Sequence, residues 1–237
     1  MGRRAQVGIG TLVIFIALVL VAAMAASLLM KTSGNLQQRA SQTGQQSTEE
    51  VSSALSVIAC VGYDDESPAG NISLLAIYVE TMAGTEQIDL STLVLSLSDQ
   101  NHLLDFRYDP SLYVNTTVAS SGGFNIFTTE EVAEGYYGMT YNNGSVLQYP
   151  SDSSDLSLRR FGVVVLSDVD NSLSDSEVPM LNRGDKAVLT INLEPNGMAL
   201  APRAQTTAWL MQEVGVPTTL SFITPSAYIN KVIPLYG

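Results

Sequence analysis

The stretch Ala5–Met30, AQVGIGTLVIFIALVLVAAMAASLLM, decides the fold of this chain. It contains no Asp, Glu, Lys, Arg or His, and Arg3-Arg4 precede it directly. As a helix, the stretch would be about 39 Å long, which is enough to cross the ~30 Å hydrocarbon layer of a membrane. Because both arginines lie on its N-terminal side, the positive-inside bias predicts that residues 1–4 lie in the cytoplasm and that the chain from residue 31 onward lies outside the cell.

The residues alone leave other interpretations of this stretch to weigh. A cleaved secretory signal would use a small-residue site such as Ala23-Met24-Ala25, but the apolar run before that site is long and apolar residues continue after it. A permanent single-span anchor for an outer domain also fits the length. A buried core helix of a soluble protein is disfavoured, because no face of this helix is polar.

The start of the chain also resembles a known family. Gly2-Arg3-Arg4, followed by AQVGIGTLV at residues 5–13 and by Phe15-Ile16-Ala17, closely resembles the start of archaeal flagellins, or archaellins, which are type IV pilin-like filament subunits. The resemblance returns weakly around Gly184-Asp185 and near the C-terminus. It implies a basic leader, residues 1–4, that a prepilin-type (preflagellin) peptidase removes by cutting between Arg4 and Ala5.

By this resemblance, the chain is expected to be a structural subunit of the archaeal flagellum, the archaellum. Its precursor would lie in the cell membrane, and the mature protein would polymerise through its N-terminal helix into an extracellular helical filament for swimming motility. Its partners would be further copies of itself and other archaellins. An archaeal type IV pilin or adhesion filament subunit and a membrane-anchored extracellular binding module are the alternatives.

The composition restricts the classes of function. The net charge of −12 argues against nucleic acid as a partner, because Arg3-Arg4 and Arg159-Arg160 are the only basic clusters. Cys60 is the only cysteine, so an intramolecular disulfide is excluded and a small buried side chain is expected. About 175 residues remain after an N-terminal helical region, which is enough for one globular domain with its own core.

The N-terminal helix is expected to extend well beyond the apolar stretch. Residues 31–50 are rich in Gln, Ser, Thr, Asn and Gly, as in a linker or a solvated helix, and Val51, Ala54, Leu55 and Ile58 then recur at helical spacing. The predicted domains are therefore a leader at 1–4, a polymerisation helix at 5–60 and an outer domain at 61–237.

After Gly70, short apolar or β-branched runs alternate with turn-forming clusters. This pattern predicts an α+β fold, with the long N-terminal helix followed by an antiparallel, immunoglobulin-like β-sandwich. Residues 109–155 are expected to hold longer loops and a subsidiary hairpin. The expected strands are Ile72–Val79, Leu90–Leu97, Leu103–Tyr108, Phe161–Leu166, Ala187–Leu193, Thr207–Val214 and Thr218–Ile223.

No pattern in the sequence predicts catalysis. His102 is the only histidine and lies among turn-forming residues, so an exposed loop residue is expected rather than a catalytic base. Gly8-Ile9-Gly10 lacks the third glycine of a dinucleotide fingerprint and follows no strand. Arg183-Gly184-Asp185 is better explained by a turn before a strand than by an adhesion motif. No catalytic or cofactor-binding residues are assigned.

Three sequons begin at Asn71, Asn115 and Asn143, at or beside predicted loops on the extracellular side. Chance alone would give a chain this rich in Ser and Thr one or two of them. Archaellins are commonly N-glycosylated, so the resemblance implies that these asparagines carry N-glycans.

The segment DVDNS at residues 168–172 is the candidate cation site. Clustered carboxylates and an Asn carbonyl are ligands that suit Ca²⁺, which makes Asp168, Asp170 and Asn171 the candidate ligands. An EF-hand is excluded, because Leu173 and Pro179 stand where Gly and Glu are needed. A solvated acidic loop is the alternative, although some archaellins bind a metal in the outer domain. No other cofactor is expected.

Overall fold

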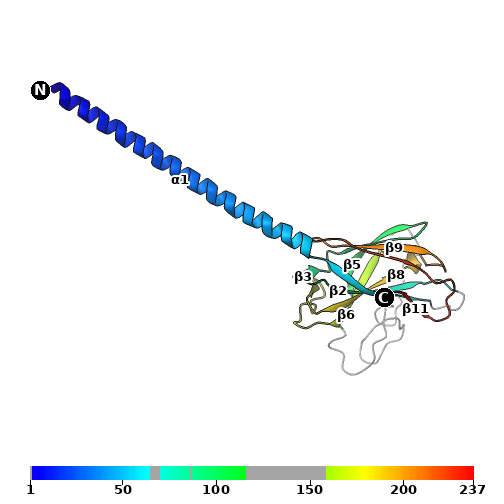
Figure 1. Ribbon diagram of the computed structural model, residues 1–237. Coiled ribbons are helices and arrows are strands. Elements are labelled where there is room, and N and C mark those ends of the chain that lie inside the picture. The colour runs from blue at the N-terminus through cyan, green and yellow to red at the C-terminus, as the bar shows by residue number, and fades with distance from the viewer. Residues whose placement is uncertain (1, 65–69, 86, 116–158) are drawn as a thin grey trace. The chain divides into compact units, whose positions relative to one another are not determined.

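The computed structural model describes residues 2–64, 70–85, 87–115 and 159–237 (Figure 1). The chain divides into two compact units, Met1–Thr48 and Glu49–Gly237. The first is made of most of one long helix, and the second is a β domain.

Helix α1 runs from Gly2 to Ser52 without a break. Its sequence contains no proline, and a Cβ atom added at Gly8, Gly10, Gly34 or Gly44 would meet nothing within 4 Å. Three threonine hydroxyls donate back to carbonyl oxygens one turn earlier, as in the 2.8 Å bond from Thr32 to Leu28. From Gly10 onward, α1 is long and apolar enough to cross a membrane, by length and composition.

The expected extension of the helix to residue 60 is wrong. α1 ends at Ser52, and Leu55–Tyr63 form strand β1 between β2 and β11. The register of β1 against β2 shifts between Val57 and Ala59, so Ile58 is an extra residue in the ladder. Of the four apolar positions at helical spacing, Val51 lies in α1 and Ala54 lies before β1, so the spacing runs across the change from helix to strand.

The β domain is built on a nine-stranded sheet with the order β10-β9-β4-β5-β6-β8-β2-β1-β11. Its strands besides β1 are β2 Leu74–Thr81, β4 Val94–Ser98, β5 Leu103–Asn115, β6 Arg160–Ser167, β8 Lys186–Asn192, β9 Gln205–Met211, β10 Thr218–Ile223 and β11 Val232–Tyr236. Two short strands, β3 Gln87–Asp89 and β7 Met180–Asn182, pair with each other. A 3₁₀ turn occupies Glu194–Asn196.

The expected class, a long apolar N-terminal helix followed by a mostly antiparallel β domain, is confirmed. The structure refines the sandwich in two respects. Within the described strands, β5 and β6 are the one parallel pair. The nine strands also form one continuous sheet that curls, so that its far ends meet at a bridge between Ala54 and Val216 and at the 2.7 Å hydrogen bond from Thr218 to the carbonyl of Leu55.

The core lies inside this curled sheet. The main buried cluster includes Phe106 and Phe161, both 0 % exposed. On β2, Ile77 belongs to this cluster, whereas the adjacent Ala76 belongs to a second buried cluster with Val188. The central strands are therefore buried on both faces, which explains their continuous apolar runs.

Candidate functional site

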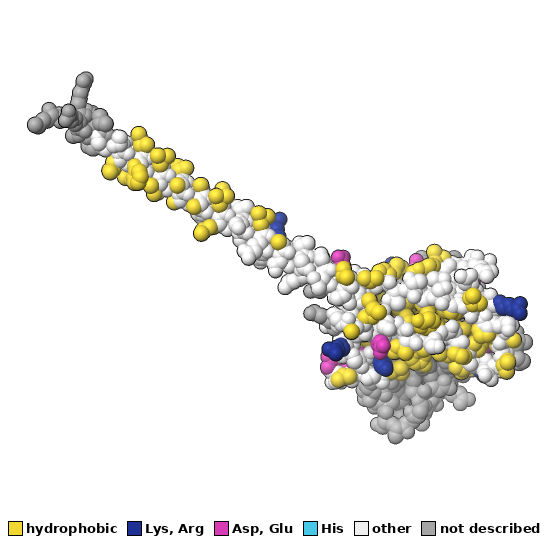
Figure 2. Space-filling model, viewed as in Figure 1, with side chains coloured by type: hydrophobic (Ala, Val, Ile, Leu, Met, Phe, Trp, Pro, Cys, Tyr) yellow, Lys and Arg dark blue, Asp and Glu magenta, His cyan; other side chains and the backbone are white. Residues whose placement is uncertain are grey.

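The apolar part of α1 is exposed along its whole described length. Its large side chains are between 50 % and 79 % exposed, and Figure 2 shows patches of apolar side chains along the N-terminal part of the helix. They are Leu12, Val13, Ile14, Phe15, Ile16, Leu18, Val19, Leu20, Val21, Met24, Leu28, Leu29 and Met30. An exposed apolar surface of this extent indicates contact with lipid or with other proteins.

Small residues are interspersed among these large side chains. They are Gly8, Gly10, Ala17, Ala22, Ala23, Ala25, Ala26 and Ser27. Small side chains allow helix backbones to approach closely, and this favours helix association where no aqueous hydrophobic drive operates. The helix surface therefore suits both a lipid environment and a bundle of helices.

Within the second unit, residues 52–54 are held by several hydrogen bonds. The hydroxyl of Thr85 lies 3.2 Å from both the carbonyl oxygen of Ser52 and the amide nitrogen of Ala54. The carbonyl oxygen of Ser53 accepts from the side chain of Gln212 at 2.8 Å and from the backbone of Val216 at 2.9 Å. The chain is thus anchored to the β domain directly after α1 ends.

The acidic loop between β6 and β7 brings carboxylates together. Oxygen atoms of Asp168, Asp170 and Asp185 all lie within 4.8 Å of one another. Two of the three predicted ligands, Asp168 and Asp170, thus lie in one cluster, with Asp185 as its third member. Asn171 instead adopts a left-handed backbone conformation (φ 65°), and its carbonyl oxygen accepts from Ser174.

Asp185 was not identified from the sequence as part of this cluster. It is 1 % exposed and accepts from the backbone of Val169 at 3.0 Å, from the hydroxyl of Ser172 at 3.0 Å and from the backbone of Asn182 at 3.2 Å. It is well separated from Asp170 in the sequence and lies in the turn before β8. Its one sequence signal is its position shortly before the run Ala187–Leu193, which the sequence predicts to be a strand.

Asp168 carries an unsatisfied oxygen. Its Oδ2 accepts from the backbone of Leu173 at 3.3 Å, whereas its Oδ1 is buried and has no hydrogen-bond partner among the described residues. A buried carboxylate oxygen without a donor is unfavourable, and two further carboxylates nearby add like-charge repulsion. Both features fit a hard cation that takes oxygen ligands.

The exposed Asp170 is held by neighbouring groups. The side-chain amide of Asn182 donates to its Oδ2 at 2.6 Å and lowers the pKa of this carboxyl group, with a smaller contribution from the backbone of Ser172. Two tyrosines of β5 hold the rest of the loop. Tyr108 donates to the carbonyl of Ser176 at 2.6 Å, and Tyr113 donates to the carbonyl of Leu173.

The three sequons differ in their surroundings. Asn71 is exposed just before β2. Asn115 is half-buried at the end of β5, where it pairs with Val165 of β6. Asn143 lies outside the described residues.

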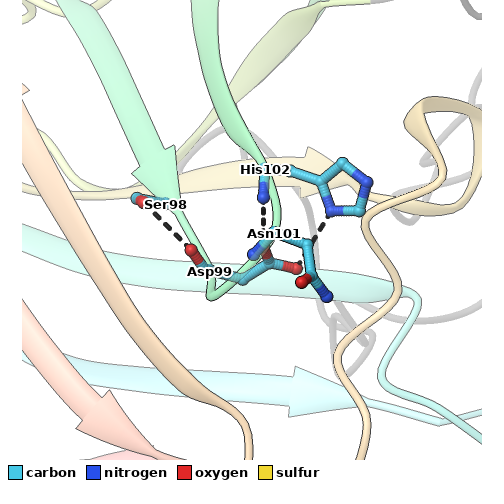
Figure 3. A network of polar contacts seen from close by, with 4 residues as sticks. All are labelled: Ser98, Asp99, Asn101 and His102. Carbon is cyan, nitrogen blue, oxygen red and sulfur yellow. Dashed lines mark hydrogen bonds and ion pairs between the residues drawn. The ribbon is translucent and has the colours of Figure 1, made fainter.

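His102 lies in the turn between β4 and β5 (Figure 3). Its ring Nδ1 is 3.3 Å from Asp99 Oδ2, and its backbone N–H donates to Asp99 Oδ1 at 2.5 Å. The nearby hydroxyl of Ser98 donates to the carbonyl of Asp99, not to the imidazole. These contacts form a turn, and they do not pair the histidine with a nucleophile.

Burial raises the pKa of the Cys60 thiol to about 12, which leaves it unreactive.

Comparison with known proteins identifies the family. The sequence profile of archaeal-type flagellins matches residues 5–222. Flagellin B2 of Methanocaldococcus jannaschii is 37 % identical, with 97 % of this chain and 93 % of the relative covered. Flagellin B3 of Thermococcus kodakarensis is also 37 % identical, with 98 % of each chain covered.

Solved structures agree with the fold. The crystal structure of archaeal flagellin FlaB1 from M. jannaschii matches with a TM-score of 0.58 and 28 % identity, over 78 % of this chain and 97 % of that one. A structure of the archaeal flagellum of Methanospirillum hungatei strain JF1 matches with a TM-score of 0.59 at 14 % identity, over 95 % and 98 % of the two chains, which supports the fold alone. The family expected from the first residues of the sequence is therefore confirmed: the chain belongs to the archaeal-type flagellins.

Proposed function

We propose that this chain is the repeating subunit of an archaeal flagellar filament and that copies assemble through α1. The observation that carries the proposal is the exposed apolar surface of the helix between Leu12 and Met30. A structural role of this kind agrees with the family and with the absence of a catalytic pattern in the sequence.

The same helix surface serves two environments in succession. In the precursor, residues 5–30 lie in the cell membrane with residues 1–4 on the cytoplasmic side. A prepilin-type peptidase cuts between Arg4 and Ala5. The helix then leaves the lipid and packs with copies of itself, and the β domain faces the medium outside the cell.

Two measurements on material sheared from cells test this proposal. Electron microscopy should show filaments whose main protein is this chain, and mass spectrometry should give a mature N-terminus at Ala5. A start after Ala25 would identify a secretory signal, and an intact Met1 in a membrane-bound monomer would identify an anchored module. If filaments contain this chain but deleting the chain leaves swimming normal, a pilin would be favoured.

The surface of the filament is proposed to be acidic and glycosylated. Asn71 is exposed and is the sequon most accessible for modification within the described residues, whereas Asn115 would need the end of β5 to open. Mass spectrometry of tryptic peptides with and without deglycosylation measures the occupancy of each sequon, Asn143 included. Unmodified peptides at all three positions would contradict the proposal.

The acidic loop is proposed to bind Ca²⁺ through Asp168, Asp170 and Asp185. The support is the buried, unpaired oxygen of Asp168 beside two further carboxylates. A cation would neutralise their repulsion and link β6 to the turn before β8. The site would be structural, and it would stabilise the β domain.

Thermal unfolding of residues 49–237 with and without calcium tests this site. A hundredfold excess of Ca²⁺ over its dissociation constant should stabilise the folded state by about 2.7 kcal/mol. The double substitution Asp168→Ala with Asp170→Ala should abolish this response. Glu213→Ala removes an exposed carboxylate elsewhere and should preserve the response. Identical melting curves with and without calcium would remove the proposal.

A further inference from the structure

The strands at the two ends of the curled sheet are uncharged, although the β domain as a whole is strongly acidic. Between Arg203 and Lys231, a stretch that contains β9 and β10, the sequence has a single charged residue, Glu213. Residues 51–63 and 232–237, which contain β1 and β11, have no charged side chain. Charged residues are depleted at the centre of protein interfaces, so both ends of the sheet are candidate contact surfaces.

The first surface lies on β9 and β10. Ala208 and Leu210 of β9 are 0 % exposed and belong to the main buried cluster, so the residues that alternate with them point to the opposite side of the sheet. Leu220 and Phe222 of β10 are buried in the same way. We call the outward side of the two strands the hairpin face; it includes Thr207, Trp209, Met211, Thr219, Ser221 and Ile223.

The hairpin face has the composition of a protein interface. Trp209 is the only tryptophan of the chain, and it lies half-buried on this face, beside Thr219 of β10. Ile223 is 65 % exposed and Met211 is 39 % exposed. Tryptophan and methionine are enriched in interfaces, and tryptophan often contributes most to the binding energy.

β10 is also an edge strand without the usual protection. Exposed edges are commonly blunted by charged residues, proline or a bulge, because an open edge can pair with another chain. The sequence of β10, TTLSFI, has no charge and no proline, and its register with β9 is regular. Among the described residues, its link to β1 is the hydrogen bond that the Thr218 hydroxyl donates to the carbonyl of Leu55. Such an edge is expected to be covered in an assembly.

The second surface lies on β11 and β1. Val232 and Pro234 of β11 alternate with Ile233, which is buried in the main cluster, and they pair with Tyr63 and Val61 of β1. Val61 and Tyr63 are partly buried on the side of the second cluster. Val232 is 48 % exposed. We call this outward side of β11 and β1 the edge face.

Both faces adjoin the point where the chain enters the β domain. β1 begins two residues after Ser53, and the carbonyl oxygen of Ser53 accepts from Gln212 and Val216 in the turn between β9 and β10. The edge face and the hairpin face therefore flank the segment that follows α1. Contacts through these faces would be continuous with an assembly that α1 mediates.

A second copy of this chain is the partner that fits both faces. Two acidic β domains repel each other over most of their surfaces, and uncharged faces allow them to approach. A contact of the hairpin face with itself would close after two copies. A contact between the hairpin face and a different face can repeat from copy to copy, as a filament requires.

We propose that the hairpin face of one copy packs against the edge face of the next copy. This inference rests on the proposed function, because it adds a contact between β domains to the assembly that α1 mediates. The contact forms when α1 holds the β domains at a high local concentration, so isolated β domains stay monomeric.

The fluorescence of Trp209 tests the burial of the hairpin face in the wild-type, full-length protein. On filament formation, quenching by acrylamide should fall and the emission should shift to shorter wavelength, because Trp209 loses contact with water. Equal quenching before and after assembly would overturn the proposal. Strong protection already in the dissociated protein would show that the same copy covers this face, which also overturns it.

Charges placed on the two faces test whether both are needed. Thr219→Glu on the hairpin face and Val232→Glu on the edge face should each raise the protein concentration needed for filament formation by about tenfold or more, because each buries a charge without a partner. Ala201→Glu adds the same charge at an exposed position outside both faces and should leave that concentration unchanged. Circular dichroism checks that the variants keep the sheet spectrum. A normal concentration for either face variant would overturn the pairing.

Cross-linking in assembled filaments tests which faces meet. With a short bis-maleimide reagent, full-length protein with Met211→Cys and Val232→Cys should give a ladder of multimers, and each single variant should give none. Cys60 is 0 % exposed and leaves little background. A cross-linked dimer from Met211→Cys alone would show that the hairpin face meets itself, and the absence of any ladder from the double variant would show that it meets another surface. Either result would overturn the pairing.

Failure of this contact is distinguishable from failure of the proposed function. If wild-type filaments form and the cross-link between the two faces is absent, the contact is wrong and the assembly through α1 remains. If a charge placed in the apolar stretch of α1 leaves filaments intact, the proposed role of α1 is wrong, whatever the two faces do.

Discussion

Helix α1 and strand β2 are both rich in large apolar residues, and they place them in opposite environments. In α1, Phe15 is 65 % exposed and Leu18 is 62 % exposed. In β2, Leu75, Ile77 and Val79 are all 0 % exposed. The strand is covered by the rest of its own domain, whereas the apolar part of α1 is apolar on every side and stays exposed among the described residues. Apolar residues alone therefore do not tell whether the partner surface lies in the same chain or in another.

Charge divides the chain along the same boundary. Residues 1–48 hold four of the 11 basic residues and none of the 23 acidic residues. The β domain from Glu49 onward is strongly acidic, and its like charges should discourage self-association. In the proposed function the helix is buried by other subunits, whereas the β domain buries its own core.

The largest expected effect comes from placing a charge on the helix. Ala17→Glu should abolish filament formation, because a charge at the centre of a membrane-spanning helix costs roughly 2.5–3.5 kcal/mol on insertion scales and a dry helix bundle should resist it similarly. Electron microscopy of full-length protein measures the result. Ala201→Glu places the same charge on an exposed position of the β domain and should assemble normally. Long filaments from Ala17→Glu would show that α1 is not the assembly element.

Removing the helix should abolish filament assembly and leave the β domain folded. Residues 49–237 should be a soluble monomer with a sheet-type circular dichroism spectrum and should form no filaments. The cut belongs before β1, because a fragment that starts at residue 61 would lose most of a strand that pairs with both β2 and β11. Sedimentation decides the outcome: spontaneous polymers of residues 49–237 would transfer the assembly role to the β domain.

The sequence was sufficient to predict those strands whose run of apolar residues is uninterrupted. The central strands, such as β6 with its run FGVVV, are apolar enough on both faces to stand out from the turn clusters around them. β1 was missed because the bulge at Ile58 mixes two periods. β11 was missed because Pro234 cannot donate to a sheet, and the strand avoids this problem by lying at the edge.

The acidic cluster shows a different limit. Asp168 and Asp170 are close in sequence, so their proximity was predictable. Asp185 joins them because β6 and β8 are neighbours in the sheet, which places the turn before β8 beside the loop that follows β6. Contacts set by strand order are not visible in local spacing.

A matched pair of core and surface substitutions tests whether the β domain is self-sufficient. Ile77→Ala leaves a cavity in the main cluster and should lower the free energy of unfolding by about 2–5 kcal/mol. Ile223→Ala removes the same side chain where it is 65 % exposed and should change stability by less than about 0.5 kcal/mol. Urea unfolding of residues 49–237 measures both. Equal effects would contradict the burial seen at Ile77.

The smallest expected effect is that of low pH on the stability of the β domain. Residues 1–48 contain no carboxylate side chain, so low pH leaves their charge unchanged. Asp99 is slightly buried, which by itself raises its pKa, but hydrogen bonds from the backbones of Asn101 and His102 outweigh this and lower the pKa below its ordinary value of 3.8. A lowered pKa in the folded state means that Asp99 stabilises the fold above that value and loses this contribution as the pH falls through the folded pKa.

Asp99→Ala should therefore lower the free energy of unfolding of residues 49–237 by about 1 kcal/mol or less at pH 7, because the turn is exposed to solvent. The loss should shrink as the pH falls below about 4, where the wild-type carboxylate also becomes protonated. Asp99→Asn keeps an oxygen that can accept from the two backbone N–H groups and should fall between the wild type and Asp99→Ala. Urea unfolding at pH 7 and pH 3 measures these differences. A loss in Asp99→Ala that is the same at both pH values would show that the geometry of the turn, and not the charge of Asp99, provides the stabilisation.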